Sequence, residues 1–441
     1  MIYKDCDIRG VYGEELKLDE VRLIGRALGT MLSGRSIIVC GDVRTSTPDI
    51  RKELIQGLME TGGNIIDIGI VPTPVAYYAK SKECLNAYAL AIVTASHNPA
   101  KYNGIKLMIG SLPPTPEDIR KIAGLVKSEK FRFSEGSTVN LDVRGAYEKK
   151  MLALSGRNER TLKVVLDIGN GTTAGIARSV YENCGYEVCE LFPEADGNFP
   201  NRNPNPADFK NLKAICQKVI DEHADFGVAF DGDGDRAVFI DDKGRPVINE
   251  KSLIMLTKLK SAGCEPGFSV VYDQKCSRIV PDTIEELGGE AILERSGHAF
   301  IKKRFLENKS LLAGEISGHF FFRELGHDDG MYAGLCIGNY IIGSGRRFSE
   351  LAETIPTPHI SPDLRYKVSY DRMDDVLKSI RDDFSGYPVS DYDGIRVELP
   401  NAWFLVRKSV TAQEMTLRIE AESDKKLDEI RENIENWYFA E

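Results

Sequence analysis

The chain has 441 residues, of which 42% are hydrophobic and 28% charged, and its formal net charge at pH 7 is −10. This composition is typical of a globular protein with sizeable cores, and the length suits about three domains. The acidic balance argues against a general nucleic-acid binder, which needs a basic face, and no stretch reaches the roughly 20 apolar residues of a membrane span. An acidic net charge is still compatible with a local basic pocket for a small phosphorylated ligand.

The first residues, MIYKDCDIRG, carry charges and have no apolar core of signal-peptide length. Nine cysteines occur singly, with no CxxC pair. Because their number is odd, they cannot all pair within the chain, so free thiols in a reducing cytosol are expected. The sequence therefore predicts a cytoplasmic protein.

One outline recurs three times along the chain. A β-branched apolar run ends in a polar turn at residues 36–47, 163–173 and 269–277, and a helical stretch that stops at glycine follows each turn. Strands that alternate with helices favour α/β layers with parallel pairing.

A third apolar run in each unit opens into an unusual loop. These stretches are residues 89–106, 226–236 and 310–319. Since ligands gather at the carboxyl ends of strands in open α/β sheets, three such loops predict three domains that face one cleft.

The last stretch differs from this outline. After a proline-bearing linker at 354–359, we expect a strand, a helix from about Asp371, three strands and a charged closing helix. The predicted fold class is α/β: three related α/β domains with mixed sheets plus a C-terminal α+β domain, arranged around a central cleft. The predicted domains are 1–145, 146–248, 249–355 and 356–441.

The stretch GVAFDGDGDRAVF places Asp231, Asp233 and Asp235 between two apolar runs. Side chains alternate in an extended loop, so all three carboxylates can turn toward one point, where hard oxygen ligands suit Mg²⁺. An EF-hand is excluded, because Arg236 and Asp242 stand where its calcium loop needs glycine and glutamate. An acidic turn without a metal is the remaining alternative.

Ser96 follows an apolar run in the stretch TASHNP, where it either caps a turn or acts as a nucleophile. His97 can position or neutralise a phosphate, and Lys106 adds a fixed positive charge. A phosphoryl group on Ser96 would give a metal bound to the aspartates its fourth ligand. The metal would then neutralise the charges of the aspartates and of the phosphate.

In GEISGH, the residues Glu315, Ser317 and His319 alternate and can share one face of a loop. A carboxylate and a hydroxyl together can grip adjacent sugar hydroxyls, although a buried hydrogen-bonded turn explains them equally well. His298, in RSGHAF, is a lone histidine, which by itself favours a structural role over a catalytic one.

Two basic stretches allow a structural as well as a functional interpretation. Arg9, in DIRG, is typical of a surface ion pair. RKSVT supplies Arg407, Lys408, Ser409 and Thr411, the mixture of charged and hydroxyl donors that a phosphate prefers, but a solvated strand end also fits.

In combination and in this order, TASHNP, DGDGDR and GEISGH resemble the α-D-phosphohexomutase superfamily, and most closely its phosphomannomutase/phosphoglucomutase branch. The similarity extends over nearly the whole chain, through DIRG, GDVRTSTP, VPTP, GNGTT, NRNPNP, DQKCSR, SGHAFIKK and HDDGMYAGL. Phosphoglucosamine mutases are less similar, because they tend to open with a longer GTDGIRG stretch and carry glutamine in the sugar loop.

The resemblance implies a phosphohexomutase that interconverts hexose 1-phosphate and hexose 6-phosphate, of mannose or glucose or both. It implies a phosphoserine, here Ser96, one Mg²⁺, and a hexose 1,6-bisphosphate that is both intermediate and activator. It also implies a monomer or weak homo-oligomer that acts on sugar phosphates.

Carried over by position, the metal ligands would be Ser96, Asp231, Asp233 and Asp235. The catalytic residues would be Ser96, His97, Lys106, Arg236 and His298, with His298 and Lys106 both open as proton carriers. The substrate-binding residues would be Arg9, Lys275, Glu315, Ser317, His319, Arg407, Ser409 and Thr411.

The chain departs from the family pattern in the phosphate loop. Val410 replaces an asparagine, Gln413 replaces a proline, and Thr416 stands where a further arginine is expected. Two alternatives stay open: a mutase for glucosamine phosphate or another hexose phosphate, and a sugar-phosphate-binding protein without turnover. The retention of Ser96 with the three aspartates argues against the second.

Overall fold

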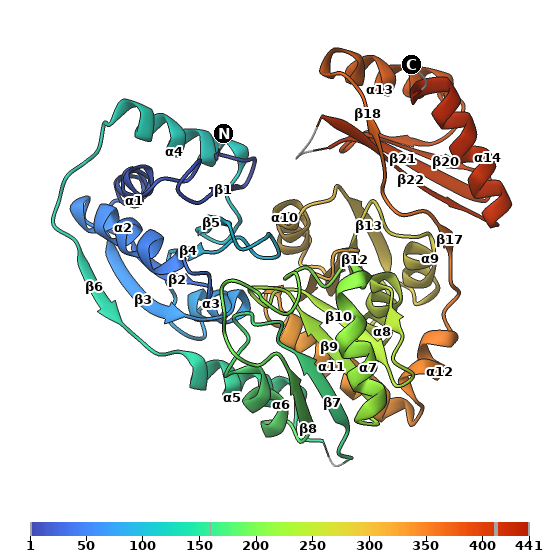
Figure 1. Cartoon of the computed structure of the whole chain (residues 1–441), viewed down its shortest axis with the longest axis horizontal. Helices are drawn as coiled ribbons and strands as arrows, with labels where there is room; N and C mark the ends of the chain where they lie inside the picture. The colour runs from blue at the N-terminus through green and yellow to red at the C-terminus, as the bar shows by residue number, and fades with distance from the viewer. Residues whose placement is uncertain (1, 159, 410–412, 440–441) are drawn as a thin grey trace.

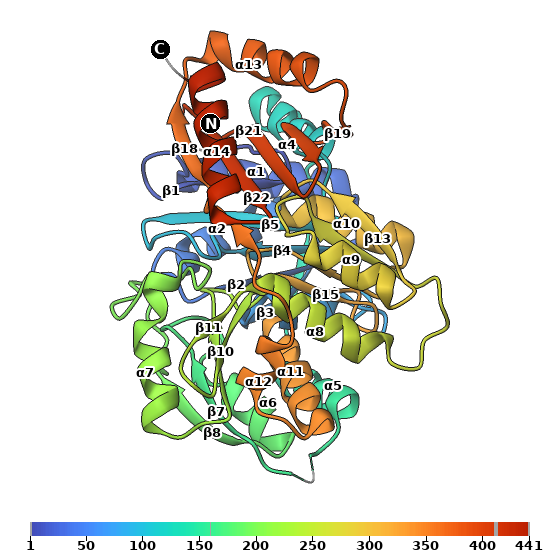
Figure 2. The same cartoon turned by 90° about the vertical axis from the view of Figure 1, so that its right-hand side faces the viewer.

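The computed structural model describes residues 2–158, 160–409 and 413–439 (Figure 1). The chain forms four sheets, one in each of four domains, numbered I to IV in chain order. Figure 1 and Figure 2 both show domain IV, at the red end of the colour bar, lying beside domain III.

Domains I to III contain mixed sheets. In domain I the strand order is β1 (Asp7–Val11), β5 (Tyr102–Ile109), β4 (Ala89–Val93), β2 (Ser36–Gly41), β3 (Asn64–Ile70) and β6 (Ser137–Asn140). In domain II it is β11 (Pro246–Val247), β10 (Ala237–Asp241), β9 (Phe226–Phe230), β7 (Lys163–Asp167) and β8 (Glu187–Leu191). In domain III it is β13 (Glu290–Glu294), β12 (Ser269–Asp273), β14 (Leu312–Gly314), β15 (Phe320–Phe322) and β16 (His327–Asp328).

The three sheets share one nucleus, in which three parallel strands are followed by an antiparallel fourth. The order is β3-β2-β4-β5 in domain I, β8-β7-β9-β10 in domain II and β13-β12-β14-β15 in domain III. The loop between the third and fourth strands of each nucleus carries one of the unusual stretches of the sequence. The prediction of three related α/β domains with mixed sheets is therefore confirmed.

Domain IV is an antiparallel sheet with two helices, which confirms the predicted α+β domain. Its strand order is β17 (His359–Ile360), β22 (Glu414–Ala421), β21 (Ala402–Lys408), β20 (Ile395–Leu399) and β19 (Val389–Ser390), and β18 (Leu364–Lys367) also pairs with β22. The helices are α13 (Tyr370–Asp383) and α14 (Asp424–Ile434), the second extended by a π-turn at Glu435–Phe439.

The helices of the first three domains cover the sheets. Domain I has α1 (Leu18–Leu32), α2 (Thr47–Glu60), α3 (Thr73–Lys80) and α4 (Pro116–Ser128), and α5 (Arg144–Ser155) leads into domain II. Domain II has α6 (Ala177–Asn183), α7 (Lys213–Asp221) and a 3₁₀ turn at Phe209–Leu212. The remaining helices are α8 (Asn249–Ser261), α9 (Ile279–Glu286), α10 (His298–Asn308), α11 (Gly330–Ser344) and α12 (Phe348–Glu353).

One continuous apolar core joins domains I to III, from Ile38 to Ile355, whereas domain IV has a core of its own. The helix α11 runs through the shared core and is buried at every position from Gly330 to Gly338, as expected for a mostly apolar helix, whereas its last turn reaches the surface. Domains I to III are thus packed as one body around the three unusual loops of the sequence.

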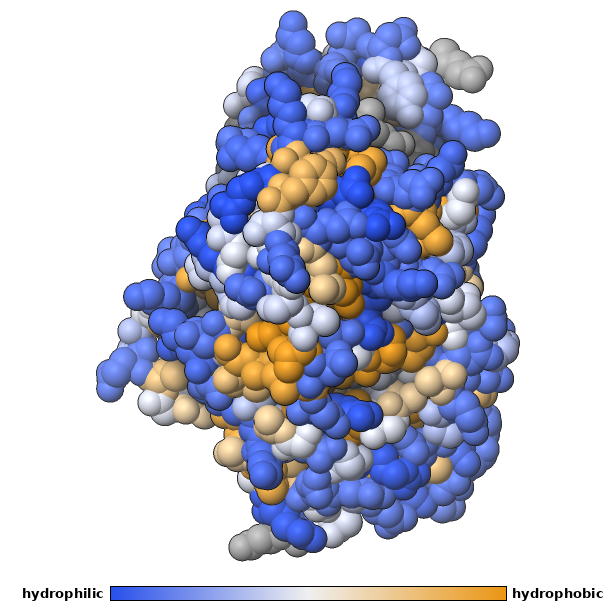
Figure 3. All heavy atoms as spheres, turned by 90° about the vertical axis from the view of Figure 1, so that its left-hand side faces the viewer, coloured by the Kyte–Doolittle hydropathy of each residue, from blue (hydrophilic) through white to orange (hydrophobic). Residues whose placement is uncertain are grey.

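Figure 3 shows the side of the molecule that is on the left in Figure 1, where apolar side chains gather at the height of β6. In this edge strand and just after it, Val139 is 49% and Leu141 40% exposed. All nine cysteines are free thiols, as the sequence predicts. Among the described residues, no helix combines the length and the apolar character that crossing a membrane requires.

Candidate active site

Ser96 lies in the loop between β4 and β5. It is 2% exposed, and its φ of 50° is in the left-handed region, which serine rarely adopts. Its Oγ donates a hydrogen bond to Asp231 Oδ2 at 2.7 Å and lies 3.3 Å from His97 Nδ1. The fold therefore joins the serine of domain I to the aspartate loop of domain II.

The aspartate loop follows β9 and brings Asp231, Asp233 and Asp235 together. One carboxylate oxygen of each lies within 4.8 Å of the other two. The two loops are so close that a Cβ on Gly232 would lie 2.5 Å from the carbonyl oxygen of Ser96.

These carboxylates have the properties of a cation site. Burial raises the pKa of Asp231 well above its usual value, and the charges of Asp235 and Asp233 add to the shift. The Oδ1 atoms of Asp233 and Asp235 are buried without a hydrogen-bond partner among the described residues. Converging hard oxygen atoms with unsatisfied lone pairs fit Mg²⁺.

Two cations lie against this cluster. Lys106 Nζ is 2.8 Å from Asp233 Oδ2 and 2.6 Å from Asp235 Oδ2. Burial lowers the pKa of Lys106, but the two aspartates outweigh it, and the pKa is raised well above the usual value. Arg236 Nε lies 3.9 Å from Asp231 Oδ2. The serine therefore faces fixed positive charge, which stabilises phosphoryl transfer.

A buried carboxylate orients two histidines beside this cluster. Asp328 Oδ2 lies 2.9 Å from His298 Nε2 and 2.8 Å from His319 Nδ1. Burial raises the pKa of Asp328, but His298 and Lys302 outweigh it and hold the pKa well below the usual value. Since an ionised carboxylate only accepts hydrogen bonds, both of these ring nitrogens carry protons.

The second nitrogens of the two histidines differ. His319 Nε2 accepts a hydrogen bond from Arg236 Nε at 2.9 Å. His298 Nδ1 has no such partner within the described part of the chain. Of the pair, His298 is therefore the one whose free nitrogen can take a proton from a ligand.

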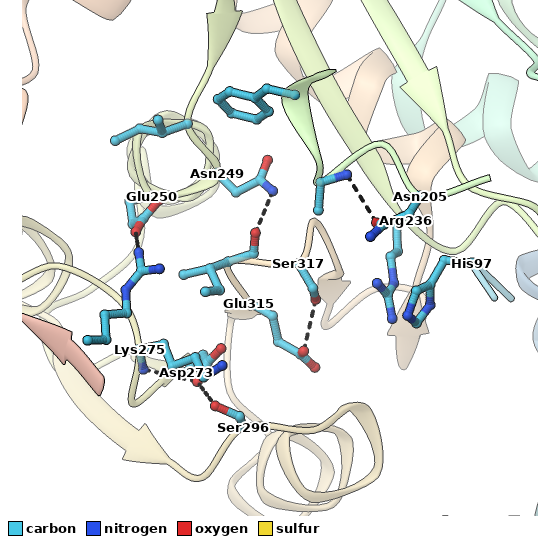
Figure 4. Close-up of a pocket in the computed structure, with 15 residues that line it drawn as sticks. His97, Asn205, Arg236, Asn249, Glu250, Asp273, Lys275, Ser296, Glu315 and Ser317 are labelled. Atoms are coloured by element: carbon cyan, nitrogen blue, oxygen red, sulfur yellow. Dashed lines mark hydrogen bonds and ion pairs between the residues drawn. The ribbon is translucent and has the colours of Figure 1, made fainter. Parts of the chain in front are cut away.

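A cavity of about 470 Å³ opens next to the serine loop and is lined by all four domains (Figure 4). Glu315 and Ser317 enter it from the loop after β14, and Ser317 Oγ donates to Glu315 Oε2 at 2.9 Å. Burial raises the pKa of Glu315 to about 7, and Asp273 adds to this shift. Its Oε1 is buried without a partner among the described residues, so a ligand hydroxyl can donate to it.

Lys275 lines the same cavity and pairs with Asp363 of domain IV at 2.5 Å. A second cavity of about 590 Å³ includes Ser96 in its lining. It also contains Arg9, Lys106, His298 and His319, and it shares His97 and Arg236 with the first. Ser96 thus lies where the two cavities meet.

The predicted phosphate loop is less well placed. Arg407 pairs with Asp393 at 2.8 Å, and neither Arg407 nor Ser409 lines either cavity. Thr411 and Val410 lie outside the described residues.

Arg418 is a site residue that the sequence argument missed. It lines the first cavity from β22, and its guanidinium lies 3.3 Å from Glu250. Thr416, where an arginine was expected, is two residues earlier and therefore on the same face of the strand. The signal was the alternation in MTLRIEA, which puts Thr416, Arg418 and Glu420 on one polar face.

The comparisons with known proteins agree along the whole chain. Models described as phosphoglucomutase/phosphomannomutase, alpha/beta/alpha domains I, II and III, match residues 1–133, 146–244 and 249–359. A phosphomannomutase/phosphoglucomutase of Pseudomonas syringae pv. tomato is 35% identical, over 98% of this chain and 93% of its own. A phosphoglucomutase of Neisseria gonorrhoeae is 33% identical, over 98% of this chain and 95% of its own.

A solved structure shows the same arrangement. The crystal structure of a phosphoglucomutase/phosphomannomutase family protein from Burkholderia thailandensis has a TM-score of 0.91 and 34% identity, over 99% of this chain and 96% of its own. Three domain models in the expected order, relatives of matching length and a common four-domain fold lead to one assignment. The chain belongs to the phosphoglucomutase/phosphomannomutase family of isomerases.

Proposed function

We propose that this protein is a hexose-phosphate mutase that interconverts the 1-phosphate and 6-phosphate of mannose, glucose or both. The observation that carries the proposal is the 2.7 Å contact between Ser96 Oγ and Asp231 Oδ2, where the two cavities meet. The names of the relatives, phosphomannomutase/phosphoglucomutase and phosphoglucomutase, support the same substrate class.

In this mechanism Ser96 carries the phosphoryl group. The free hydroxyl oxygen of the sugar phosphate attacks the phosphorus on Ser96, the bond from phosphorus to Ser96 Oγ breaks, and a bisphosphorylated sugar forms. After the sugar has turned around, Ser96 Oγ attacks the other phosphate and the bond from that phosphorus to the sugar oxygen breaks. The sugar oxygen takes back a proton, and the isomeric monophosphate leaves. Lys106 and Arg236 stabilise the charge on the phosphoryl oxygens.

The proton of the attacking hydroxyl goes to His298 Nδ1, the nitrogen without a partner in the described chain. Asp328 holds the opposite nitrogen of the ring and so keeps the proton there. Lys106 is the weaker candidate, because two aspartates bind its ammonium group and favour its charged form. Glu315 and Ser317 hold sugar hydroxyls in the first cavity.

Asp231, Asp233 and Asp235, with an oxygen on Ser96, would hold one Mg²⁺, which when bound supplies positive charge to the phosphoryl oxygens. The proposal extends to hexose 1,6-bisphosphate as activator, to a monomer or weak homo-oligomer, and to the domain divisions 1–145, 146–248, 249–355 and 356–441. A cytoplasmic location is supported by the nine free thiols.

The test is a coupled mutase assay with Mg²⁺ and a trace of hexose 1,6-bisphosphate. Mannose 1-phosphate, glucose 1-phosphate and glucosamine 1-phosphate are supplied separately, and the 6-phosphates are read out. Turnover of either of the first two, abolished by chelation and restored by Mg²⁺, is the expected result.

The other outcomes separate the alternatives. Turnover of glucosamine 1-phosphate alone would move the protein to the phosphoglucosamine branch. Binding of these sugars without turnover of any of them would make it a sugar-phosphate-binding protein.

A further inference from the structure

Arg44 is a buried arginine, 1% exposed, in the loop between β2 and α2. It takes no part in the steps above. Its Nε donates to Asp42 Oδ2 at 3.0 Å, and among the described residues its two Nη atoms donate to backbone carbonyls of the serine loop and the start of β5. These carbonyls belong to Ser96 (2.8 Å), Asn98 (2.6 Å), Pro99 (2.9 Å) and Tyr102 (3.0 Å).

These contacts hold a conformation that the loop does not favour by itself. Ser96 has a φ of 50°, and such backbone strain persists only where the surroundings impose it. The planar guanidinium can serve several carbonyls in different directions, whereas the three donors of lysine radiate from one atom.

Asp42, which binds Arg44, also supports Ser96 through Thr94. The backbone N–H of Ser96 donates to Thr94 Oγ1 at 2.9 Å, and the hydroxyl of Thr94 donates to Asp42 Oδ2 at 2.7 Å. Asp42 therefore binds both Arg44 and Thr94, the first residue of the serine loop.

Domain II encloses Arg44 from the other side. The guanidinium carbon lies 5.1 Å from the centre of the Phe199 ring, and a Cβ on Gly197 would lie 2.5 Å from Arg44 Cα. Arg44 is thus located at the boundary across which Ser96 of domain I must meet Asp231 of domain II.

We propose that Arg44 is a positioning residue for phosphoryl transfer, whose guanidinium holds the serine loop so that Ser96 Oγ stays against the aspartate cluster. It touches no reacting atom and acts through the backbone of the loop. The expected fall in kcat rests on the proposed function. The expected change in the position of Ser96 rests on geometry alone.

The test is Arg44→Lys, which keeps the positive charge beside Asp42 but removes the planar guanidinium that binds several carbonyls at once. Displacement of a reacting group by about 1 Å can cost 10²-fold in rate, so we expect kcat to fall by roughly 10²-fold. KM should stay within about threefold, because the first cavity is not lined by Arg44. A crystal structure of the variant should show Ser96 outside the left-handed region.

Leu28→Ala is the matched control for lost stability. Leu28 is 1% exposed and lies on α1. It belongs to an apolar cluster within domain I that is separate from the core shared by domains I to III. Its truncation lowers the melting temperature but leaves kcat of the folded enzyme unchanged.

The outcomes are distinguishable. An inactive wild type would overturn the proposed function, while the position of Ser96 in the Arg44→Lys structure would still decide the role of Arg44. A variant that keeps wild-type kcat, or whose Ser96 keeps its φ, would overturn the inference. If Arg44→Lys does not fold, Asp42→Asn removes the charge that holds Nε, and the same loss of kcat at constant KM is required of it.

Discussion

At Ser96, a single oxygen atom determines whether the chain can carry a phosphoryl group. Ser96→Ala removes that oxygen and leaves the first cavity intact, because Ser96 does not line it. We expect kcat to fall by roughly 10⁴-fold or more, with sugar-phosphate binding retained. The measurements are steady-state kinetics, calorimetric binding and the intact mass, with the exposed Ser128→Ala as control. Substantial residual turnover would show that another group accepts the phosphate.

Asp329 gives the folded protein a dependence on pH. It is fully buried, accepts hydrogen bonds from Tyr147 Oη at 2.8 Å and Tyr332 N at 2.9 Å, and burial raises its pKa to about 7. The unfolded value is about 3.9, so the folded state binds this proton more tightly. The stabilisation is complete below about pH 4 and is lost as the pH rises through about 7.

Asp329→Asn should remove this dependence, since an amide can accept from Tyr332 N and donate to Tyr147 Oη. The free energy of unfolding, measured in urea from pH 5 to 8, should fall with rising pH more steeply in the wild type than in the variant. Parallel curves for the two proteins would contradict the shift.

At the same scale, sequence reasoning could find residues whose meaning depends on close neighbours in the chain. Asp231, Asp233 and Asp235 are recognisable because their spacing alone brings three carboxylates together. Asp328 and Arg44 could not be recognised, since their roles arise from contacts with residues that are distant in the sequence. A buried arginine that binds carbonyls leaves no pattern of its own.

At the scale of elements, the alternation of apolar runs and glycine-terminated helices was enough to predict the three repeated units. It could not predict what each helix terminus touches. The helix α3 begins with Thr73, whose hydroxyl donates to Asp233 Oδ2 at 2.7 Å and whose N–H donates to Asp233 O at 2.8 Å. The stretch VPTP was therefore visible in the sequence, but its support of the aspartate loop was not.

The helix α11 makes close contacts through its glycines. A Cβ on Gly334 would lie 1.9 Å from Tyr181 Oη, which is buried and donates to Met331 O at 3.1 Å. The tyrosine ring is rigid, so Gly334→Ala must shift the ring or the helix, and we expect a loss of about 1–3 kcal/mol of stability. Chemical denaturation measures it.

Gly343→Ala is the control on the same helix, because nothing lies within 4 Å of a Cβ at that position. It should leave stability unchanged or raise it by up to about 1 kcal/mol, since alanine favours helix. Equal losses in the two variants would mean that the contact with Tyr181 does not determine the effect.

At the scale of the whole molecule, domains I to III share one core, whereas domain IV is held by polar contacts. Glu420 on β22 accepts from Ser277 Oγ at 2.8 Å, Arg278 N at 3.1 Å and Trp403 Nε1 at 2.6 Å. Ser277 and Arg278 belong to the loop after β12 that also carries Lys275. The contact between domains and the position of a cavity residue are therefore linked.

Glu420→Ala should loosen this link and leave its three donors unsatisfied. We expect KM to rise several-fold with a smaller change in kcat, and domain IV to unfold before the rest, at a cost of about 1–3 kcal/mol. Calorimetry and steady-state kinetics test it, with the exposed Glu422→Ala near the same strand as control. A single unfolding transition with unchanged KM would contradict the link.

The approach of Gly232 to the carbonyl oxygen of Ser96 also restricts how the gene can drift. Every change at the first or second base of a glycine codon introduces a side chain or a stop, and any side chain here would meet a backbone atom that no substitution can remove. Codon 232 can therefore vary only synonymously in any lineage that keeps the two loops together. The close approach of the two loops thus leaves its record in silent substitutions.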